Sequence, residues 1–438
     1  MINLFILNVV LPGGNGDFGN MLNFVRSLRM GSRVKKLSVF VVCVKSQLSD
    51  LKKISKSEPE INYIYLTANL DYQSYKQNDH FHYGVPGPGK IKLDKKYNDI
   101  LNTADIAIEF PVSYPFRKEV FKFYKKKWCR FLEYGRSPGY ASKGVYRTGF
   151  NKSSKGILFH SKDWYKNILN NKKLKSELSV VLKNKTIESF IENHYLTCCY
   201  IRPNPNDRYN KVLLNFIFLI LINQKDDMRD IAIITSTKIE TLENIKFILY
   251  DFGINEVSII RPKMLETNLI IKYEDFSEDE KNKLRRLEGK RRLIIWSGFL
   301  FDQKIFQSLL SISIQSAKRK TNGAHFLGAC GDGSLTDLFS LMVESNFPFI
   351  PVIKPTLDFH YEHLKRMEVF GKELKISSEA RLVINSVLKI EHLNGFELNE
   401  LIMVCRKDQI QKEIHLVMSY IYKNWNLNKF LDKILNKV

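Results

Sequence analysis

No run of apolar residues in this sequence is long enough to cross a bilayer. The longest, residues 212–222, contains Asn215 and falls short of the roughly 20 residues that a transmembrane helix needs. The mostly apolar opening, residues 2–10, passes into a glycine-rich turn rather than a small-residue cleavage site, so we interpret it as a buried strand. These features favour a folded cytoplasmic protein.

Cysteine pairs with the spacing of metal ligands or redox motifs are also missing. The cysteines are scattered without a CxxC pair, and most lie in apolar, strand-like runs. Adjacent Cys198 and Cys199 would point to opposite faces of a strand, which keeps them from sharing a metal or bonding to each other. We therefore expect buried, reduced thiols at all six positions: Cys43, Cys129, Cys198, Cys199, Cys330 and Cys405.

Several common catalytic motifs are absent. No DxD stands at a strand end, and no GxSxG or HExxH occurs. Residues 84–90 have the spacing of a P-loop, but Ile91 stands where magnesium needs a hydroxyl group, and two prolines intrude. These absences predict a reaction that uses neither a metal ion nor a cofactor.

Acidic residues are too few to balance the basic ones. The 68 Lys and Arg against 46 Asp and Glu give a net charge of +22, which favours anionic partners such as phosphorylated substrates, nucleic acid or an acidic membrane surface. No nucleic-acid-binding signature accompanies the charge, so nucleic acid is not our first choice. Abundant Lys, Asn and Ile also fit an AT-rich bacterial source. A bacterial protein of this kind could also be translocated into a host cell.

A chain of 438 residues suggests two or three domains, and we expect two. β-Branched and aromatic runs alternate with segments of helical length, which predicts α/β folding with mainly parallel sheets. The expected strands are 2–10, 38–44, 61–66, 104–110, 128–134 and 156–160, then 196–202, 231–236, 257–261, 293–297, 325–329 and 348–353. We place domains at 1–193 and 194–375, followed by a helical segment, 376–438, that packs across the junction.

A glycine-rich turn follows the first expected strand. It contains Gly13, Gly14, Asn15, Gly16, Asp17 and Gly19 and precedes a helical run. Glycines at such a turn let the backbone approach a ligand and leave N–H groups free at the helix start. Asp17 would then serve as general base for an acceptor hydroxyl or amine, the alternative being a helix-capping role.

A second such turn, residues 328–337, follows the strand expected at 325–329. Ser334 has the position of an N-cap, and Asp337, three residues on, that of its capping-box partner. Gly331, Asp332 and Gly333 would then form an open helix start that holds a diphosphate. The alternative is a capped helix with no ligand.

These two turns, placed in two α/β halves, resemble the GT-B glycosyltransferase superfamily. The turn at Gly16 to Gly19 also resembles the G-D-x-G turn of bacterial protein-arginine rhamnosyltransferases, although Gly13 stands where that family has a further aspartate. The resemblance implies two Rossmann-like, doubly wound domains facing across a cleft. It also implies a nucleotide-sugar in the second domain at Gly331 to Ser334, and a catalytic Asp17.

Further candidates come from strand ends. Arg202 would contact a phosphate, and Glu109 would approach the acceptor. His360 and His363, with Asp358, follow the last expected strand and would contact the base or sugar, but they lack a third strong metal ligand. Each of these residues has a structural alternative.

The prediction is a metal-independent glycosyltransferase that uses a nucleotide-sugar donor and an acceptor that the sequence does not identify. A sugar-nucleotide epimerase of the same architecture is the first alternative. A non-catalytic, basic protein that binds nucleic acid or membrane is the second.

Overall fold

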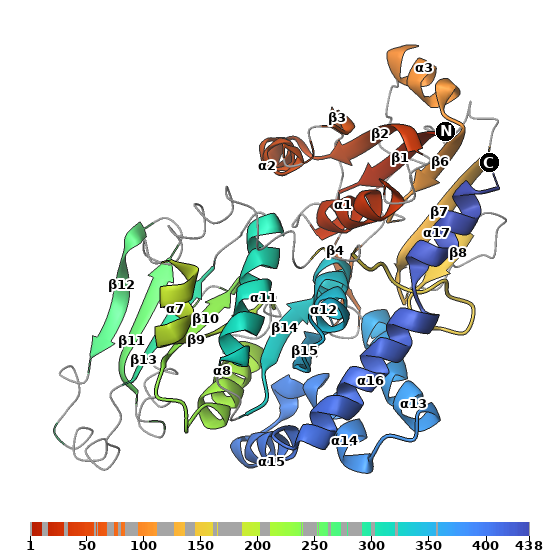
Figure 1. The fold of residues 1–438 in the computed structure, drawn as a ribbon. Helices are drawn as coiled ribbons and strands as arrows, with labels where there is room; N and C mark the ends of the chain where they lie inside the picture. The colour runs from red at the N-terminus through yellow and green to blue at the C-terminus, as the bar shows by residue number, and fades with distance from the viewer. Residues whose placement is uncertain are drawn as a thin grey trace. The chain divides into compact units, whose positions relative to one another are not determined.

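The computed structural model of this chain divides into two compact units (Figure 1). Unit 1 comprises Met1–Ser161 together with Lys423–Val438, and unit 2 comprises Lys162–Tyr422. The residues that the structure describes are 2–10, 16–29, 34–56, 58, 60–67, 74–77, 80–83, 95–111, 127–135, 145–160, 164, 186–201, 211–237, 239, 252, 254–261, 264–272, 278, 291–298, 303–319, 323–355 and 358–437.

Unit 1 is built on a six-stranded, parallel sheet in the order β3-β2-β1-β6-β7-β8. The chain moves outward from β1 through β2 and β3, crosses back, and continues on the other side of β1, which is a doubly wound order. Its elements are β1 (Ile2–Val9), α1 (Gly16–Arg29), β2 (Val34–Cys43), η1 (Lys45–Gln47), α2 (Leu48–Ser55), β3 (Asn62–Thr67), the hairpin β4 (Ser74–Gln77) and β5 (His80–Tyr83), α3 (Lys95–Thr103), β6 (Ile106–Glu109), β7 (Lys127–Tyr134), β8 (Val145–Thr148) and α17 (Leu427–Leu435).

Apolar clusters cover both faces of this sheet. Alternate residues of β1 point to opposite faces, so Ile6 joins one cluster and Leu7 the other. The first cluster contains residues of α1 together with Leu427 and Leu431 of α17, whereas the second contains Leu101 of α3. Unit 1 is therefore completed by a helix that follows unit 2 in the sequence.

Unit 2 contains a seven-stranded sheet in the order β12-β11-β13-β10-β9-β14-β15. All its neighbouring pairs are parallel except the edge pair of β11 and β12. Its elements are α7 (Ile187–Asn193), β9 (His194–Cys199), α8 (Lys211–Asn223), β10 (Asp230–Thr235), β11 (Ile254–Arg261), β12 (Met264–Lys272), β13 (Arg291–Ser297), α11 (Gln303–Lys318), β14 (Phe326–Cys330), α12 (Gly331–Ser345), β15 (Ile350–Lys354), α13 (Asp358–Glu373), α14 (Ser378–Val387), η3 (Ile390–His392), α15 (Gly395–Cys405) and α16 (Asp408–Asn424).

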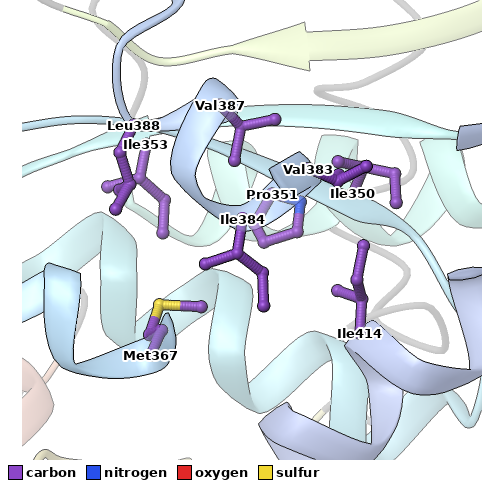
Figure 2. Close-up of a pocket in the computed structure, with 9 residues that line it drawn as sticks. All are labelled: Ile350, Pro351, Ile353, Met367, Val383, Ile384, Val387, Leu388 and Ile414. Atoms are coloured by element: carbon purple, nitrogen blue, oxygen red, sulfur yellow. The ribbon is translucent and has the colours of Figure 1, made fainter. Parts of the chain in front are cut away.

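Helices α13, α14 and α16 pack apolar side chains around β15. A small pocket there is lined wholly by apolar side chains, which come from β15, α13, α14 and its C-terminal end, and α16 (Figure 2). Its walls are therefore core packing rather than a polar ligand site. The lining residues are Ile350, Pro351, Ile353, Met367, Val383, Ile384, Val387, Leu388 and Ile414.

The α/β class and the doubly wound order are confirmed for each unit. Eleven of the twelve expected strands coincide with described strands. The strand expected at 156–160 is wrong, since Gly156 and Ile157 form only isolated bridges, Ile157 with Asn426 beside α17. All six cysteines are buried and none of them forms a disulfide, as expected. None of the helices within the described ranges is long and apolar enough to cross a bilayer.

The units divide at different residues from those expected. The expected boundary at 193 separates α7 from unit 2, but α7 packs against β9 and α11 of that unit. The expected third segment, 376–438, is helical, yet α14 and α15 belong to unit 2 and α17 belongs to unit 1. Local patterns show where helices occur, but they do not show which sheet each helix covers.

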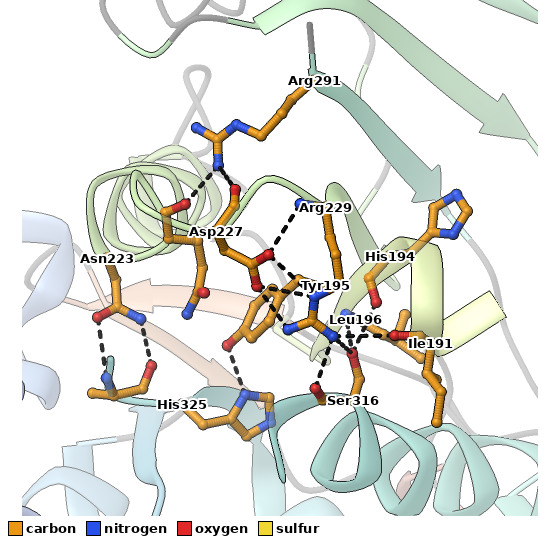
Figure 3. Close-up of polar contacts among 12 residues, drawn as sticks. Ile191, His194, Tyr195, Leu196, Asn223, Asp227, Arg229, Arg291, Ser316 and His325 are labelled. Atoms are coloured by element: carbon orange, nitrogen blue, oxygen red, sulfur yellow. Dashed lines mark hydrogen bonds and ion pairs between the residues drawn. The ribbon is translucent and has the colours of Figure 1, made fainter. Parts of the chain in front are cut away.

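A buried ionic network lies where the strands of unit 2 begin (Figure 3). Arg229 holds the Asp227 carboxylate, with 2.7 Å between Nη2 and Oδ2, and its Nη1 donates to the carbonyls of Ile191 and Ser316. Nη1 of Arg291 donates to the carbonyl of Asp227 at 2.7 Å. These bonds join α7, α11 and the turn before β10.

We predict that Arg229→Met destabilises the fold by about 3–5 kcal/mol, because it leaves the Asp227 carboxylate buried without its partner. The matched control is Arg319→Met. Arg319 pairs with Glu192 at 3.0 Å, but both side chains are largely exposed, so the loss should stay below about 1 kcal/mol. Chemical unfolding of both variants measures the difference, and equal losses would contradict the analysis.

Stability should also fall with acid through His325. Nδ1 of this buried ring lies 2.6 Å from the hydroxyl of Tyr195, and burial lowers the pKa of His325 to about 3. The unfolded chain binds this proton near pH 6.5, so stability is complete above that pH and is lost as the pH falls toward 3.

In His325→Asn we expect the dependence of unfolding free energy on pH to become shallower by up to about 1.4 kcal/mol per pH unit between pH 4 and 6. Tyr195→Phe is the control, since it removes the hydrogen bond and keeps the titrating ring. Urea unfolding at several pH values tests this. An unchanged slope in His325→Asn would refute the assignment.

Candidate functional site

The order of strands in unit 2 reverses between β9 and β14. From β9 the chain proceeds to β10 and the strands beyond it, then crosses to β14 and β15 on the other side. In open α/β sheets, ligands bind at the carboxyl ends of the strands at such a reversal. Here that edge contains the ends of β9 and β14 and the start of α12.

Gly328 allows β9 and β14 to lie close together. A Cβ on Gly328 would stand 3.0 Å from Sγ and 3.1 Å from Cα of Cys199. The N–H of Tyr200 donates to the Gly328 carbonyl at 3.0 Å. A side chain at Gly328 would therefore push the two strands apart at the reversal point.

Helix α12 begins at Gly331, directly after the last residue of β14. Gly331 has a φ of +75°, which is a left-handed conformation that L side chains rarely adopt. Within the described part of the chain, no atom lies within 4 Å of the point where a Cβ would stand on Gly331. The backbone is therefore open to a ligand at the helix start.

The expected capping box is wrong. Cys330 is the N-cap, without a side-chain cap, so Ser334 already lies inside the helix. Its Oγ accepts from the N–H of Cys330 at 3.1 Å and donates back to the carbonyl of the same residue. Asp337 accepts from Nε2 of Gln307 on α11 at 2.7 Å and is buried. The left-handed turn at Gly331 starts the helix earlier than the capping pattern indicates.

Asp332 and His360 form a buried pair at this edge. Asp332 is the second residue of α12 and His360 the third of α13, and Oδ1 of the carboxylate lies 3.2 Å from Nε2 of the ring. Both side chains are 7% exposed. His363 lies one turn further along α13, and burial, together with the charge of His360, lowers the pKa of His363 to about 3. His363 is therefore neutral near pH 7.

Unit 1 has its own reversal of strand order, between β1 and β6. Asp17 lies in the first turn of α1, the helix that follows β1, and Glu109 ends β6. Because β1 and β6 are parallel neighbours, α1 begins at the same edge of the sheet at which Glu109 lies. The topology thus puts the start of α1, with Asp17, at the same edge of the sheet as Glu109.

Glu109 is held by a residue that the sequence analysis missed. Its Oε2 accepts from Nε of Arg130 at 2.6 Å, and Glu109 itself is only 1% exposed. Burial raises the pKa of Glu109, and the Arg130 charge opposes that shift. Its Oε1 has no hydrogen-bond partner among the described residues. Arg130 could have been found from the register, since it stands opposite Glu109 on β7.

Several candidates lie outside the described residues. These are Gly13, Gly14, Asn15 and Arg202, while Gly16 and Asp17 are described only as backbone in α1. Gly19 lies within α1 with open space at its Cβ position. In the described part of the chain, no group of three or more His, Cys, Asp or Glu side chains is arranged to hold a metal ion.

The sequence matches no protein-family model and no curated protein. Solved structures with a similar course of the chain include Acinetobacter baumannii MurG, at 9% identity and a TM-score of 0.46, with 100% of both chains covered. Another is S. aureus TarM G117R in complex with fondaparinux, alpha-GlcNAc-glycerol and UDP, at 8% identity and a TM-score of 0.41, covering 100% of this chain and 99% of that one. A third is Arabidopsis thaliana UGT89C1 complexed with UDP-L-rhamnose, at 10% identity and a TM-score of 0.39, covering 100% of this chain and 98% of that one. At these identities and TM-scores, the likenesses assign no function.

Proposed function

We propose that this protein is a glycosyltransferase whose unit 2 binds a nucleoside diphosphate sugar at the carboxyl ends of β9 and β14. The observation that carries the proposal is the junction at Gly331, where a helix begins directly after a strand at the reversal of strand order. Phosphate groups bind the free N–H groups at helix starts, where the helix dipole favours negative charge. The open backbone at Gly331 suits the approach of a diphosphate.

We assign the donor site to Gly331, Asp332 and Gly333, and we add Arg202, which follows β9 in the sequence. Ser334 and Asp337 support the junction instead, because their side chains are bonded to Cys330 and Gln307. The helix start would stabilise the negative charge that develops on the leaving diphosphate.

The acceptor side of the proposal uses unit 1. The acceptor hydroxyl or amine attacks the anomeric carbon, the bond from that carbon to the diphosphate oxygen breaks, and the nucleoside diphosphate leaves with the bonding electrons. The acceptor proton passes to Asp17 as general base. Glu109, whose Oε2 is bonded to Arg130, would orient the acceptor through its other oxygen.

We predict that one sugar nucleotide among UDP-, GDP-, TDP- and CMP-sugars raises the thermal midpoint by about 5 °C at 100-fold excess over Kd. Asp332→Ala should lose most of this shift, because it removes the carboxylate that contacts His360 at 3.2 Å and joins the starts of α12 and α13. Asp17→Ala should keep the shift and lose turnover. The matched control is Asp408→Ala, which also changes an acidic residue in the first turn of a unit 2 helix, but an exposed one away from the junction.

Product analysis of the same samples separates transfer from epimerisation, since an epimerase converts the donor without an acceptor. The proposal fails if no sugar nucleotide shifts the wild-type midpoint. It also fails if Asp332→Ala and Asp408→Ala behave alike.

Gly331→Ala tests the junction itself. The methyl group has space but forces alanine into a left-handed conformation, so we expect a loss of about 1 kcal/mol in stability. It also stands where the diphosphate would approach, so the nucleotide Kd should rise about tenfold or more. Gly395→Ala is the control, because Gly395 also opens a unit 2 helix and has open space without a left-handed φ. Equal nucleotide affinity in both variants would contradict the prediction.

A further inference from the structure

The starts of α12 and α13 lie at the same edge of the unit 2 sheet. Strands β14 and β15 are parallel and paired from Phe326 with Ile350 to Cys330 with Lys354. The helices that follow them therefore begin side by side, and each presents its positive dipole end to that edge. Asp332 and His360 each lie in the first turn of their helix, and their contact of 3.2 Å joins the two turns.

The composition of α13 makes this contact unusual. Its buried stripe continues from His360 and His363 into Leu364, Met367 and Phe370, all buried. Apolar side chains would fill the first two positions without the cost of desolvating two polar rings. A stability role therefore does not account for a histidine at position 360.

We propose that His360 is a positioning residue, which holds the first turn of α13 against α12 through Asp332 so that both helix starts face the donor diphosphate. This inference rests on the proposed function. It adds a residue of α13 to the site, whereas the glycine-rich turn at residues 328–337 indicates α12 alone.

Electrostatics point the same way. Asp332 alone would place a negative charge in the first turn of the helix that is to bind an anion, and like charges close together repel. Nε2 of His360 lies 3.2 Å from Oδ1 of this carboxylate and partly shields its charge from a bound anion. Loss of His360 should therefore affect a phosphorylated ligand more than an uncharged one.

The experiment measures binding of UDP, GDP and dTDP by calorimetry, and then binding of the nucleoside that corresponds to the tightest diphosphate. The variants are His360→Leu, His360→Gln, Asp332→Asn and the double variant Asp332→Asn with His360→Leu. Leucine suits the buried position because it continues the apolar stripe of α13. Glutamine suits it because it keeps an N–H donor. We use both so that at least one folded variant is available for the measurement. Thermal unfolding checks that each variant is folded.

We expect the diphosphate Kd of His360→Leu to rise about tenfold, with little change for the nucleoside. The diphosphate Kd of His360→Gln should lie between that value and the wild-type value. The double variant should bind no more weakly than His360→Leu, because His360 acts through Asp332.

Two results for the diphosphate would overturn this inference but not the proposed function: a Kd of His360→Leu within twofold of the wild-type value, or losses of affinity that multiply in the double variant. Equal losses for diphosphate and nucleoside would also overturn it, because they indicate general damage to the site. If wild-type protein binds none of the three diphosphates, the proposed function fails as well, which distinguishes the two failures.

Discussion

The close approach of β9 and β14 at Gly328 is the constraint on which the unit 2 site depends. The two strands share a single register pair, Gly328 with Cys199, and a hydrogen bond from Tyr200. This narrow joint places the first strand of the unit beside the strand that leads into α12. Gly331 and the start of α12 owe their position at the reversal point to it.

In the unit 2 sheet, the side where the strands begin and the side where they end differ in how their polar groups are arranged. Where the strands begin, Arg229 and Arg291 bond carboxylate and carbonyl oxygens in a buried network that rigidifies its surroundings (Figure 3). At the opposite edge, the backbone at Gly331 is open, and the buried pair of Asp332 and His360 joins two helix starts. The unit 2 sheet thus combines a cross-linked end with an end at which the backbone is accessible.

Much of the fold could be predicted from the sequence, because buried parallel strands are short apolar runs separated by segments of helical length. The strands that were missed have weaker patterns. In β12, Glu266 and Asn268 interrupt the apolar residues, and β8 is only four residues long. The run at 156–160 is apolar enough for a strand, but its backbone pairs with residues beside α17 instead of the sheet.

The candidate site was harder to predict than the fold. The glycines of the second turn pointed to the correct junction, but the capping pattern placed the helix start at Ser334 because φ at Gly331 cannot be read from the sequence. The partners of the acids were also hidden. Arg130 and His360 are distant in sequence from Glu109 and Asp332, and only strand register and helix packing bring them together.

The return of the chain to unit 1 has a consequence for biosynthesis. Leu427 and Leu431 of α17 complete the same apolar cluster as Phe18 and Met21 of α1. The ribosome releases the strands of unit 1 first, then all of unit 2, and only afterwards the helix that covers one face of the first sheet. Until then α1 covers that face without α17, so the nascent chain completes its second core before the apolar cluster on that face.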